Sequence, residues 1–294
     1  MDRTGGSAVR RKGVGVELGV VVQNRGPNAI ENVRTLPPFH ESLGFHSTWF
    51  TDHVAGVRSF QPVYGPEWAE CLTSLAFAAA RTTRIRLGIG VLVAPYRDPV
   101  MAAKMLVTLD GLSDGRLNIG IGTGWSRSEF HALGRGDLFE ARGRYTDEAV
   151  AVMARCFEGG EFGWEGEFVN FRRMEPLPLP IQRPHPPLWV GGQSGAGLRR
   201  AAKWADVWHP TRLKPDEIAS MGAELDERAG RTIPRSVRIP IPVDMEVATL
   251  VDELASYDQA GCVEVVMELH TEDTQVAMGW AEKLAAAYDL TPAP

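Results

Sequence analysis

The chain of 294 residues contains little cysteine and no long apolar run. Its three cysteines, Cys71, Cys156 and Cys262, lie far apart and form no C-x-x-C pair. We therefore expect buried, small apolar side chains in a reducing compartment rather than a disulfide framework. No apolar stretch approaches the roughly 18 residues that a membrane-spanning helix needs, and residues 1–13 lack the apolar core of a signal peptide. These absences predict a cytoplasmic protein with a flexible tail over residues 1–13.

The chain has no long run of charges of one sign. The formal net charge is −6, and no run of five like charges occurs. Neither a nucleic acid nor a membrane surface is therefore an expected partner, and a small-molecule substrate is expected instead.

Several catalytic motifs are missing. No G-x-S-x-G nucleophile motif occurs, and no pair of histidines has the H-E-x-x-H spacing of a zinc site, so no metal is expected. The glycine-rich segment 120–125 is not a phosphate loop, because Trp125 follows Gly124 where a lysine is needed. Its G-x-G-x-G spacing also differs from the dinucleotide-binding pattern.

What the sequence does contain is a regular alternation of apolar strands and helices, repeated eight times over residues 14–294. This alternation predicts a parallel sheet, either an open doubly wound sheet or a closed (β/α)8 TIM barrel. The count of eight and the missing dinucleotide loop favour the barrel as a single domain. Residues 159–186 are rich in Gly, Pro and aromatic residues, which indicates an insertion after the fourth strand and its helices.

The stretch from Asp98 to Gly134 carries the strongest functional signal. An apolar strand runs into the loop Gly120-Ile121-Gly122-Thr123-Gly124, and a helix start follows with Ser126 and Glu129 at capping-box spacing. A glycine-rich turn between a strand and a helix lets the backbone approach a flat or anionic ligand closely. We place a cofactor here, although such a turn is also common as a purely structural element.

Asp52 and His53 close the second predicted strand. A histidine titrates near neutral pH, so His53 is suited to proton transfer, and a barrel carries its active site at the strand ends. The adjacent Asp52 could orient the ring, although neighbours on a strand point to opposite faces. The alternative is a histidine that only caps a loop. Among the other histidines, only His209 is placed to face the same site.

Two further strand ends carry glycines. Gly88 and Gly90 lie inside a branched strand, which indicates either a close ligand approach or tight packing. The turn Gly191-Gly192-Gln193-Ser194 precedes a helix, where backbone N–H groups and the serine hydroxyl would bind an anion unless the turn is only structural. Of the tryptophans, Trp125 alone is expected to reach the pocket.

Three segments resemble the bacterial luciferase-like superfamily, and within it the oxidoreductases that use the deazaflavin coenzyme F420. The resemblance spans residues 14–210 and fits the remaining third more loosely. It implies a homodimeric (β/α)8 barrel with an insertion and hydride transfer between coenzyme F420 and a small organic substrate. The segments are TWFTDHV, TTRIRLGIGVLVAPYRDPVMAAKMLVTLDGLSDGRLNIGIGTGW and PPLWVGGQSGAGLRRAAKWADVWHP.

The resemblance also implies roles for individual residues. His53 would exchange a proton beside the cofactor ring, with Asp52 as its neighbour, and Gly90-Val91 would form a cis peptide bulge behind the ring. A sugar-phosphate dehydrogenase branch has an acidic residue where this chain has Trp125, so a more hydrophobic substrate is expected. The remaining cofactor contacts would be Thr123, Gly124 and Ser128 near the ring and its side chain, and Gly191, Gly192, Gln193 and Ser194 at the phosphate.

Two other functions remain open. An FMN-dependent monooxygenase that uses molecular oxygen shares the barrel and the phosphate turn, and a non-catalytic barrel that only binds a flavin or deazaflavin is a third possibility. Neither the direction of hydride transfer nor the substrate follows from the sequence. The substrate is expected to depend on residues 55–66 and 159–186.

Overall fold

The computed structural model describes residues 15–54 and 67–292. The predicted tail over residues 1–13 and the predicted substrate loop over residues 55–66 lie outside this range. Within the described range, no helix is both long enough and apolar enough to cross a membrane.

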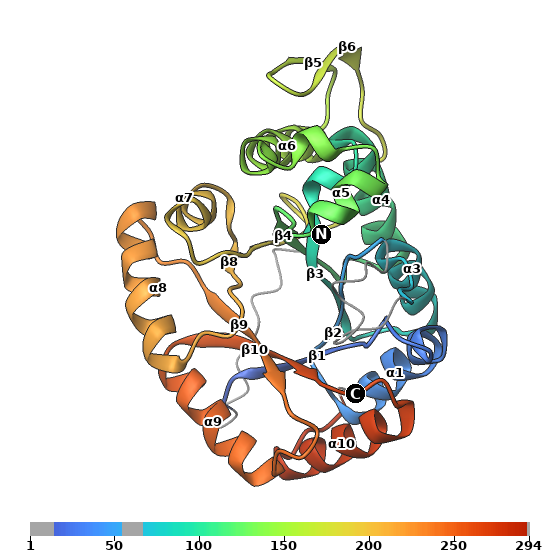
Figure 1. Cartoon of the computed structure of the whole chain (residues 1–294), viewed down its shortest axis with the longest axis vertical. Helices are drawn as coiled ribbons and strands as arrows, with labels where there is room; N and C mark the ends of the chain where they lie inside the picture. The colour runs from blue at the N-terminus through green and yellow to red at the C-terminus, as the bar shows by residue number, and fades with distance from the viewer. Residues whose placement is uncertain (1–14, 55–66, 293–294) are drawn as a thin grey trace, which may run out of the picture.

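Eight parallel strands close into a barrel in the order β1-β10-β9-β8-β7-β4-β3-β2 (Figure 1), which confirms the predicted (β/α)8 fold. Most of their residues are buried, as expected for parallel strands covered by helices. The barrel strands are β1 (Glu17–Val21), β2 (Ser47–Phe50), β3 (Arg86–Val93), β4 (Leu117–Gly122), β7 (Leu188–Val190), β8 (Val207–Trp208), β9 (Arg235–Ile241) and β10 (Cys262–Leu269).

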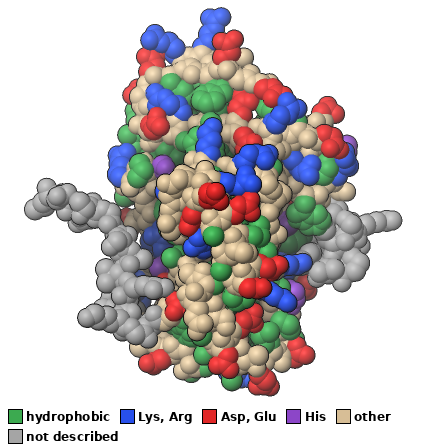
Figure 2. All heavy atoms as spheres, turned by 90° about the vertical axis from the view of Figure 1, so that its left-hand side faces the viewer, with side chains coloured by type: hydrophobic (Ala, Val, Ile, Leu, Met, Phe, Trp, Pro, Cys, Tyr) green, Lys and Arg blue, Asp and Glu red, His purple; other side chains and the backbone are tan. Residues whose placement is uncertain are grey.

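Helices surround the barrel (Figure 1), and their buried residues are mostly apolar. Charges of both signs cover the outer surface on the α7–α9 side (Figure 2). Local signals set their ends: the Asp98 carboxylate accepts from the N–H groups of Val100 and Met101, and Gly44 ends the first helix at a φ of 89°. The helices are α1 (Ala29–Leu43), α3 (Cys71–Arg81), α4 (Pro99–Leu112), α5 (Arg127–Ala132), α6 (Arg142–Glu158), α7 (Gly195–Trp204), α8 (Pro215–Ala229), α9 (Val247–Gln259) and α10 (Thr274–Ala287), with short 3-10 turns η1 (Ala94–Tyr96) and η2 (Gly136–Leu138).

One helix starts later than its sequence pattern predicts. A helix is expected from residue 67, but α3 begins at Cys71 because the Glu70 side chain caps it through the Thr73 N–H at 2.7 Å. Trp68 instead forms an isolated antiparallel bridge with Arg25. This bridge holds Trp68 beside the end of β1, and the indole becomes part of the cavity wall described below.

The predicted insertion is outside the barrel. Its residues include an antiparallel hairpin, β5 (Phe162–Glu165) and β6 (Asn170–Met174), whose strands pair with each other as a separate two-stranded sheet. The hairpin projects from the α6 side in Figure 1, away from the barrel strands.

The indole of Trp49 fills the middle of the barrel and is fully buried. A Cβ atom built on Gly88 would lie 2.1 Å from the Trp49 Cδ2 atom, so packing explains this glycine. Trp49 in turn stacks on His209, with ring centroids 5.1 Å apart and planes at 15°. The middle of the barrel is therefore filled by aromatic side chains.

Candidate active site

A cavity of about 630 Å³ opens at the carboxyl ends of the strands. Parallel strands in a barrel end at one rim, so strand-end residues far apart in sequence converge there. The wall contains most of the residues singled out from the sequence. These are Asp52, His53, Gly90, Val91, Thr123, Gly124, Trp125, Gly191, Gly192 and Ser194, together with His209.

His53 is held by the carboxylate of Glu129. The His53 Nδ1 atom lies 2.9 Å from Glu129 Oε2, and the Glu129 side chain is fully buried. The same carboxylate accepts from the Val54 N–H at 2.8 Å and from the Tyr96 hydroxyl at 3.0 Å. Burial opposes ionisation of Glu129, but these hydrogen bonds outweigh it and lower its pKa. Glu129 is therefore an anion that fixes the imidazole ring.

Two indoles flank this imidazole. The ring centroid of Trp68 lies 4.3 Å from that of His53, and the centroid of Trp125 lies 5.9 Å away. Trp125 is 60% exposed, which places it at the mouth of the cavity. Aromatic walls of this kind exclude water from His53 and offer flat surfaces to an organic ligand.

Asp52 does not orient the His53 ring, which was one role considered from the sequence. Its carboxylate accepts two hydrogen bonds from the Arg97 guanidinium, at 2.6 and 2.9 Å, and one from the Val93 N–H at 2.9 Å. These contacts join the end of β2 to the end of β3. The carboxylate that orients His53 is therefore that of Glu129, not that of its chain neighbour.

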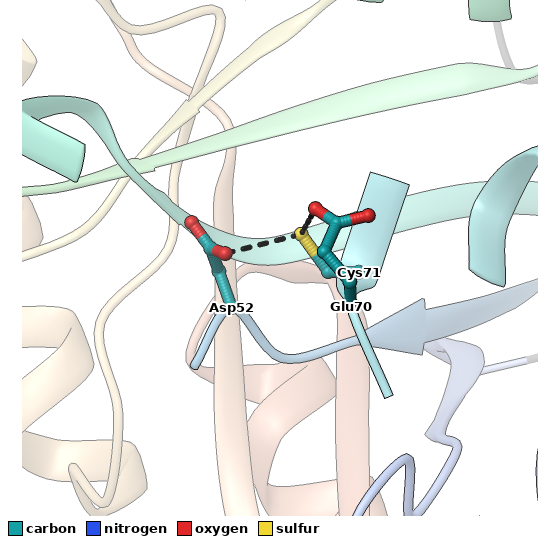
Figure 3. A group of neighbouring side chains, drawn as sticks. All are labelled: Asp52, Glu70 and Cys71. Carbon is teal, nitrogen blue, oxygen red and sulfur yellow. Dashed lines mark hydrogen bonds between the residues drawn. The ribbon is translucent and has the colours of Figure 1, made fainter. Parts of the chain in front are cut away.

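Asp52, Glu70 and Cys71 form the one acid–thiol group in the described residues with metal-like spacing (Figure 3). Arg97 already binds both carboxylates, at 2.6 Å from Asp52 and 2.9 Å from Glu70. Burial, followed by the charge of Asp52, raises the pKa of the Cys71 thiol well above its usual value. Because Arg97 neutralises both carboxylates, this group acts as a structural ion pair.

The third strand carries an irregularity at the cavity. The Gly90–Val91 peptide bond is cis, at the position that the resemblance implied. The pairing of β3 with β4 slips between Ile89 and Leu92, and this slip turns the Val91 side chain toward Gly122. Val91 lines the cavity beside this cis peptide bond.

The turn before α7 forms another part of the wall. Gly192 has a φ of 103°, and the Ser194 hydroxyl caps the helix by accepting from the Gly197 N–H at 3.1 Å. Arg200, one turn further along, lines the cavity and is fixed by Asp147 at 2.6 Å. A helix start with a nearby guanidinium suits a phosphate group.

Two of the predicted residues do not line the cavity. Ser128 is exposed on α5, and Gln193 is exposed with its amide donating to the Thr211 carbonyl. Both lie one position from a residue that lines the cavity or supports one that does, but their own side chains turn outward.

Comparison with known proteins identifies the family. The sequence pattern of the luciferase-like monooxygenases matches residues 16–292, which is nearly all of the chain. The chain belongs to this family. An uncharacterised protein of Mycobacterium tuberculosis is 33% identical over 221 residues, covering 72% of this chain and 74% of the relative.

One further relative and one solved structure of the same fold have stated activities. The FMNH2-dependent dimethylsulfone monooxygenase of Pseudomonas putida is 28% identical over 208 residues, covering 70% of this chain and 54% of the relative. An F420-dependent secondary alcohol dehydrogenase, solved with an F420–acetone adduct, shares the fold with a TM-score of 0.79. That likeness covers 95% of this chain and 99% of the other at 14% identity.

Sequence reasoning missed several residues of the cavity and its supports. Glu129 was singled out only as the third residue of a capping box. One of the two hydrogen bonds of such a box is present, because the Glu129 N–H donates to Ser126 Oγ at 3.4 Å. Its carboxylate turns instead to His53, which lies 76 residues earlier. Tyr96, Arg97, Arg238 and Glu268 gave no local signal, because each acts through a partner distant in sequence.

Proposed function

We propose that the protein transfers a hydride between coenzyme F420 and a small organic substrate, with His53 exchanging the accompanying proton. The observation that carries this proposal is the buried Glu129 carboxylate, which holds His53 at the wall of a cavity whose other walls suit a flat cofactor. The secondary alcohol dehydrogenase of the same fold supports the choice of a deazaflavin.

The residues present fit such a cofactor. A Cβ atom on Gly191 would meet no atom closer than 3.4 Å, so this glycine leaves room at the wall that a side chain would fill. Gly90, Val91, Thr123 and Gly124 would hold the ring and its side chain, and Gly191, Gly192, Ser194 and Arg200 the phosphate. When bound, the deazaflavin ring supplies the hydride donor or acceptor.

His53 and Glu129 would carry out the proton exchange with the substrate. Ionised Glu129 accepts the Nδ1–H of His53, which leaves Nε2 as the ring nitrogen that gives or takes a proton at the substrate. The same carboxylate stabilises the charged imidazolium when the ring is protonated. Trp68 and Trp125 shield this exchange from bulk water.

The first test is a titration of the purified protein with coenzyme F420 and, separately, with FMN, followed by fluorescence. We expect tight binding of the deazaflavin and weak binding of FMN. The next test is His53→Ala, which should abolish most turnover of a reducible substrate while cofactor affinity stays near wild type. Unchanged turnover with bound cofactor would show that His53 has no proton role.

The FMN-dependent monooxygenase is the second candidate, and the dimethylsulfone monooxygenase relative favours it. A deazaflavin lacks the ring nitrogen that supports oxygen chemistry, so oxygen uptake separates the two. Preference for FMN with substrate-dependent oxygen consumption would move the assignment to this class. Failure to bind either cofactor would support a barrel without catalysis.

We also propose a homodimer, as the family resemblance implies. Light scattering coupled to size-exclusion chromatography should give about twice the chain mass of 32.2 kDa. A value near the chain mass at micromolar concentration would contradict this proposal.

A further inference from the structure

A second charged cluster, distinct from the Asp52–Arg97 pair, lies on β9, β10 and the segment after β1. The Arg25 Nη1 atom lies 2.7 Å from Glu268 Oε1, and the Arg238 Nη2 atom lies 2.6 Å from Glu268 Oε2. All three residues line the cavity. Two guanidinium groups share one carboxylate, so the cluster carries net positive charge.

Arg238 retains donors for a ligand. Its Nη1 donates to the Gly90 carbonyl at 2.6 Å, and its Nε and Nη2 donate to Glu268. These contacts use three of the five N–H groups of a guanidinium. One N–H on each terminal nitrogen has no acceptor among the described residues, and a charged N–H group is a strong donor to a carboxylate.

His209 provides an independent sign of a missing partner. It is 4% exposed and lines the cavity, and its Nδ1 atom lies 2.9 Å from Ser236 Oγ. Its Nε2 atom is buried and has no hydrogen-bond partner within the described part of the chain. Buried polar atoms are nearly always satisfied, so a ligand atom is the natural partner for this one.

These features define one polar floor of the cavity, made of Arg25, Arg238, Glu268 and His209. Building on the function proposed above, we propose that this floor binds a planar oxyanion of a ligand in the cavity. Its source is either a substrate carboxylate or the anionic oxygen edge of a bound cofactor ring. The cavity therefore combines an apolar wall, made of Trp68 and Trp125, with a positively charged floor.

The arrangement also orients the ligand. The Arg25 guanidinium lies 5.9 Å from the Trp68 ring, whose other neighbour is His53 at 4.3 Å. The His53–Glu129 side of the cavity is acidic, whereas the floor is basic. A ligand with one anionic end is therefore drawn to the floor by that end, with its remaining atoms toward His53.

The probe pair is benzoate and benzamide, which have the same shape and differ in charge. Each is titrated into the full-length protein, followed through tryptophan fluorescence, because Trp68 and Trp125 line the cavity. We expect benzoate to bind wild type roughly tenfold or more tightly than benzamide, since hydrogen bonds to charged groups are the stronger kind. Arg238→Met should remove this preference, and Arg238→Lys should retain part of it.

A second variant is expected to bind benzoate more tightly, a result that a misfolded protein cannot give. Glu268→Gln removes the only negative charge of the floor, so benzoate should bind several-fold more tightly while benzamide is unchanged. Unfolding cannot produce this result. A Glu268→Gln protein that binds benzamide normally and benzoate no better than wild type would overturn the proposal.

The same variants are titrated with coenzyme F420 and FMN to identify the source of the oxyanion. Loss of benzoate preference alone assigns the floor to the substrate, whereas a matching loss of cofactor affinity in Arg238→Met assigns it to the cofactor. The proposal fails if Arg238→Met changes none of these affinities. The proposed function fails differently, through the absence of any cofactor binding by wild type.

Discussion

At the scale of single residues, Glu129 has two roles that its position in the sequence does not separate. Its N–H is part of the start of α5, where the Ser126 hydroxyl accepts it. Its carboxylate binds His53, Val54 and Tyr96. A capping residue is worth about 1 kcal/mol of stability, whereas a buried carboxylate that orients a histidine affects chemistry.

Replacement of Glu129 with Gln should therefore lower turnover by roughly 10- to 100-fold. The amide keeps the shape but loses the charge that holds the imidazole and stabilises its protonated form. Cofactor affinity should stay near wild type. The measurement is the steady-state rate with saturating cofactor.

Ser126→Ala is the matched control, because it removes the cap and leaves the carboxylate in place. It should cost about 1 kcal/mol in the free energy of unfolding, with a much smaller effect on rate. If both variants slow turnover equally, Glu129 acts through the helix start and not through His53.

The sequence predicted the strand-end residues of the site but not the residues that support them. Asp52, His53 and the glycine turns were predicted because each closes a strand, and barrel topology then brings strand ends together. The supports of these residues were not predicted. Arg238 contacts the Gly90 carbonyl from 148 residues away, and such a pair leaves no local pattern.

At the scale of elements, β3 contains two glycines with different neighbours. A Cβ on Gly88 would lie 2.1 Å from Trp49, whereas a Cβ on Gly90 would lie 3.2 Å from the same indole. The sequence left packing and ligand approach open for this strand. The structure assigns packing to Gly88, while Gly90 lines the cavity as well.

Gly88→Ala should consequently destabilise the protein by about 3 kcal/mol, since overpacking a rigid core forces neighbours off their rotamers. Gly111→Ala in α4 is the control, because a Cβ there meets nothing within 4 Å. That change should stabilise the helix by about 0.5–1 kcal/mol. Chemical denaturation of both variants gives the two free energies, and equal effects of the same sign would contradict the packing argument.

The observed ends of helices and strands agree with the sequence where a local residue signal marks the boundary. The strand Ser47–Phe50 and the helix Pro99–Leu112 are two such elements, because Gly44 and Asp98 mark the adjoining turns. The start of α3 was misplaced by four residues, since the Arg25–Trp68 bridge that keeps this segment out of the helix is a long-range contact.

At the scale of the whole molecule, buried titratable groups predict how stability depends on pH. Burial lowers the pKa of His40 to about 3, and burial with Arg238 lowers that of His209 to about 3. Burial opposes the shift of Glu268, but Arg238 and Arg25 lower its pKa to about 2. In every case the unfolded chain takes up a proton at a higher pH than the folded protein does.

Stability should therefore be greatest above about pH 6.5 and should fall as the pH drops toward 3, first through the histidines and then, below about pH 4.5, through Glu268 as well. We expect a loss on the order of a few kcal/mol by pH 4. Thermal unfolding between pH 7 and pH 4 measures it. A melting temperature that is constant over this range would contradict the prediction.

His40→Asn provides the comparison, because an amide can replace the contact of Nδ1 with Thr48 Oγ1 but does not titrate. The variant should lose less stability between pH 6.5 and pH 4 than wild type does. Its activity at pH 7 should be close to wild type, since His40 lies against Phe45, away from the cavity wall.

The stack of Trp49 and His209 has a consequence for kinetics. It closes the barrel below the cavity, and Trp125 stands at the mouth above, so ligands enter and leave on the same side. When two molecules share such a space, the one seated deeper must arrive first and depart last. Initial-rate measurements with both ligands varied should then show an ordered sequence of addition, and inhibition by product should follow the reverse order.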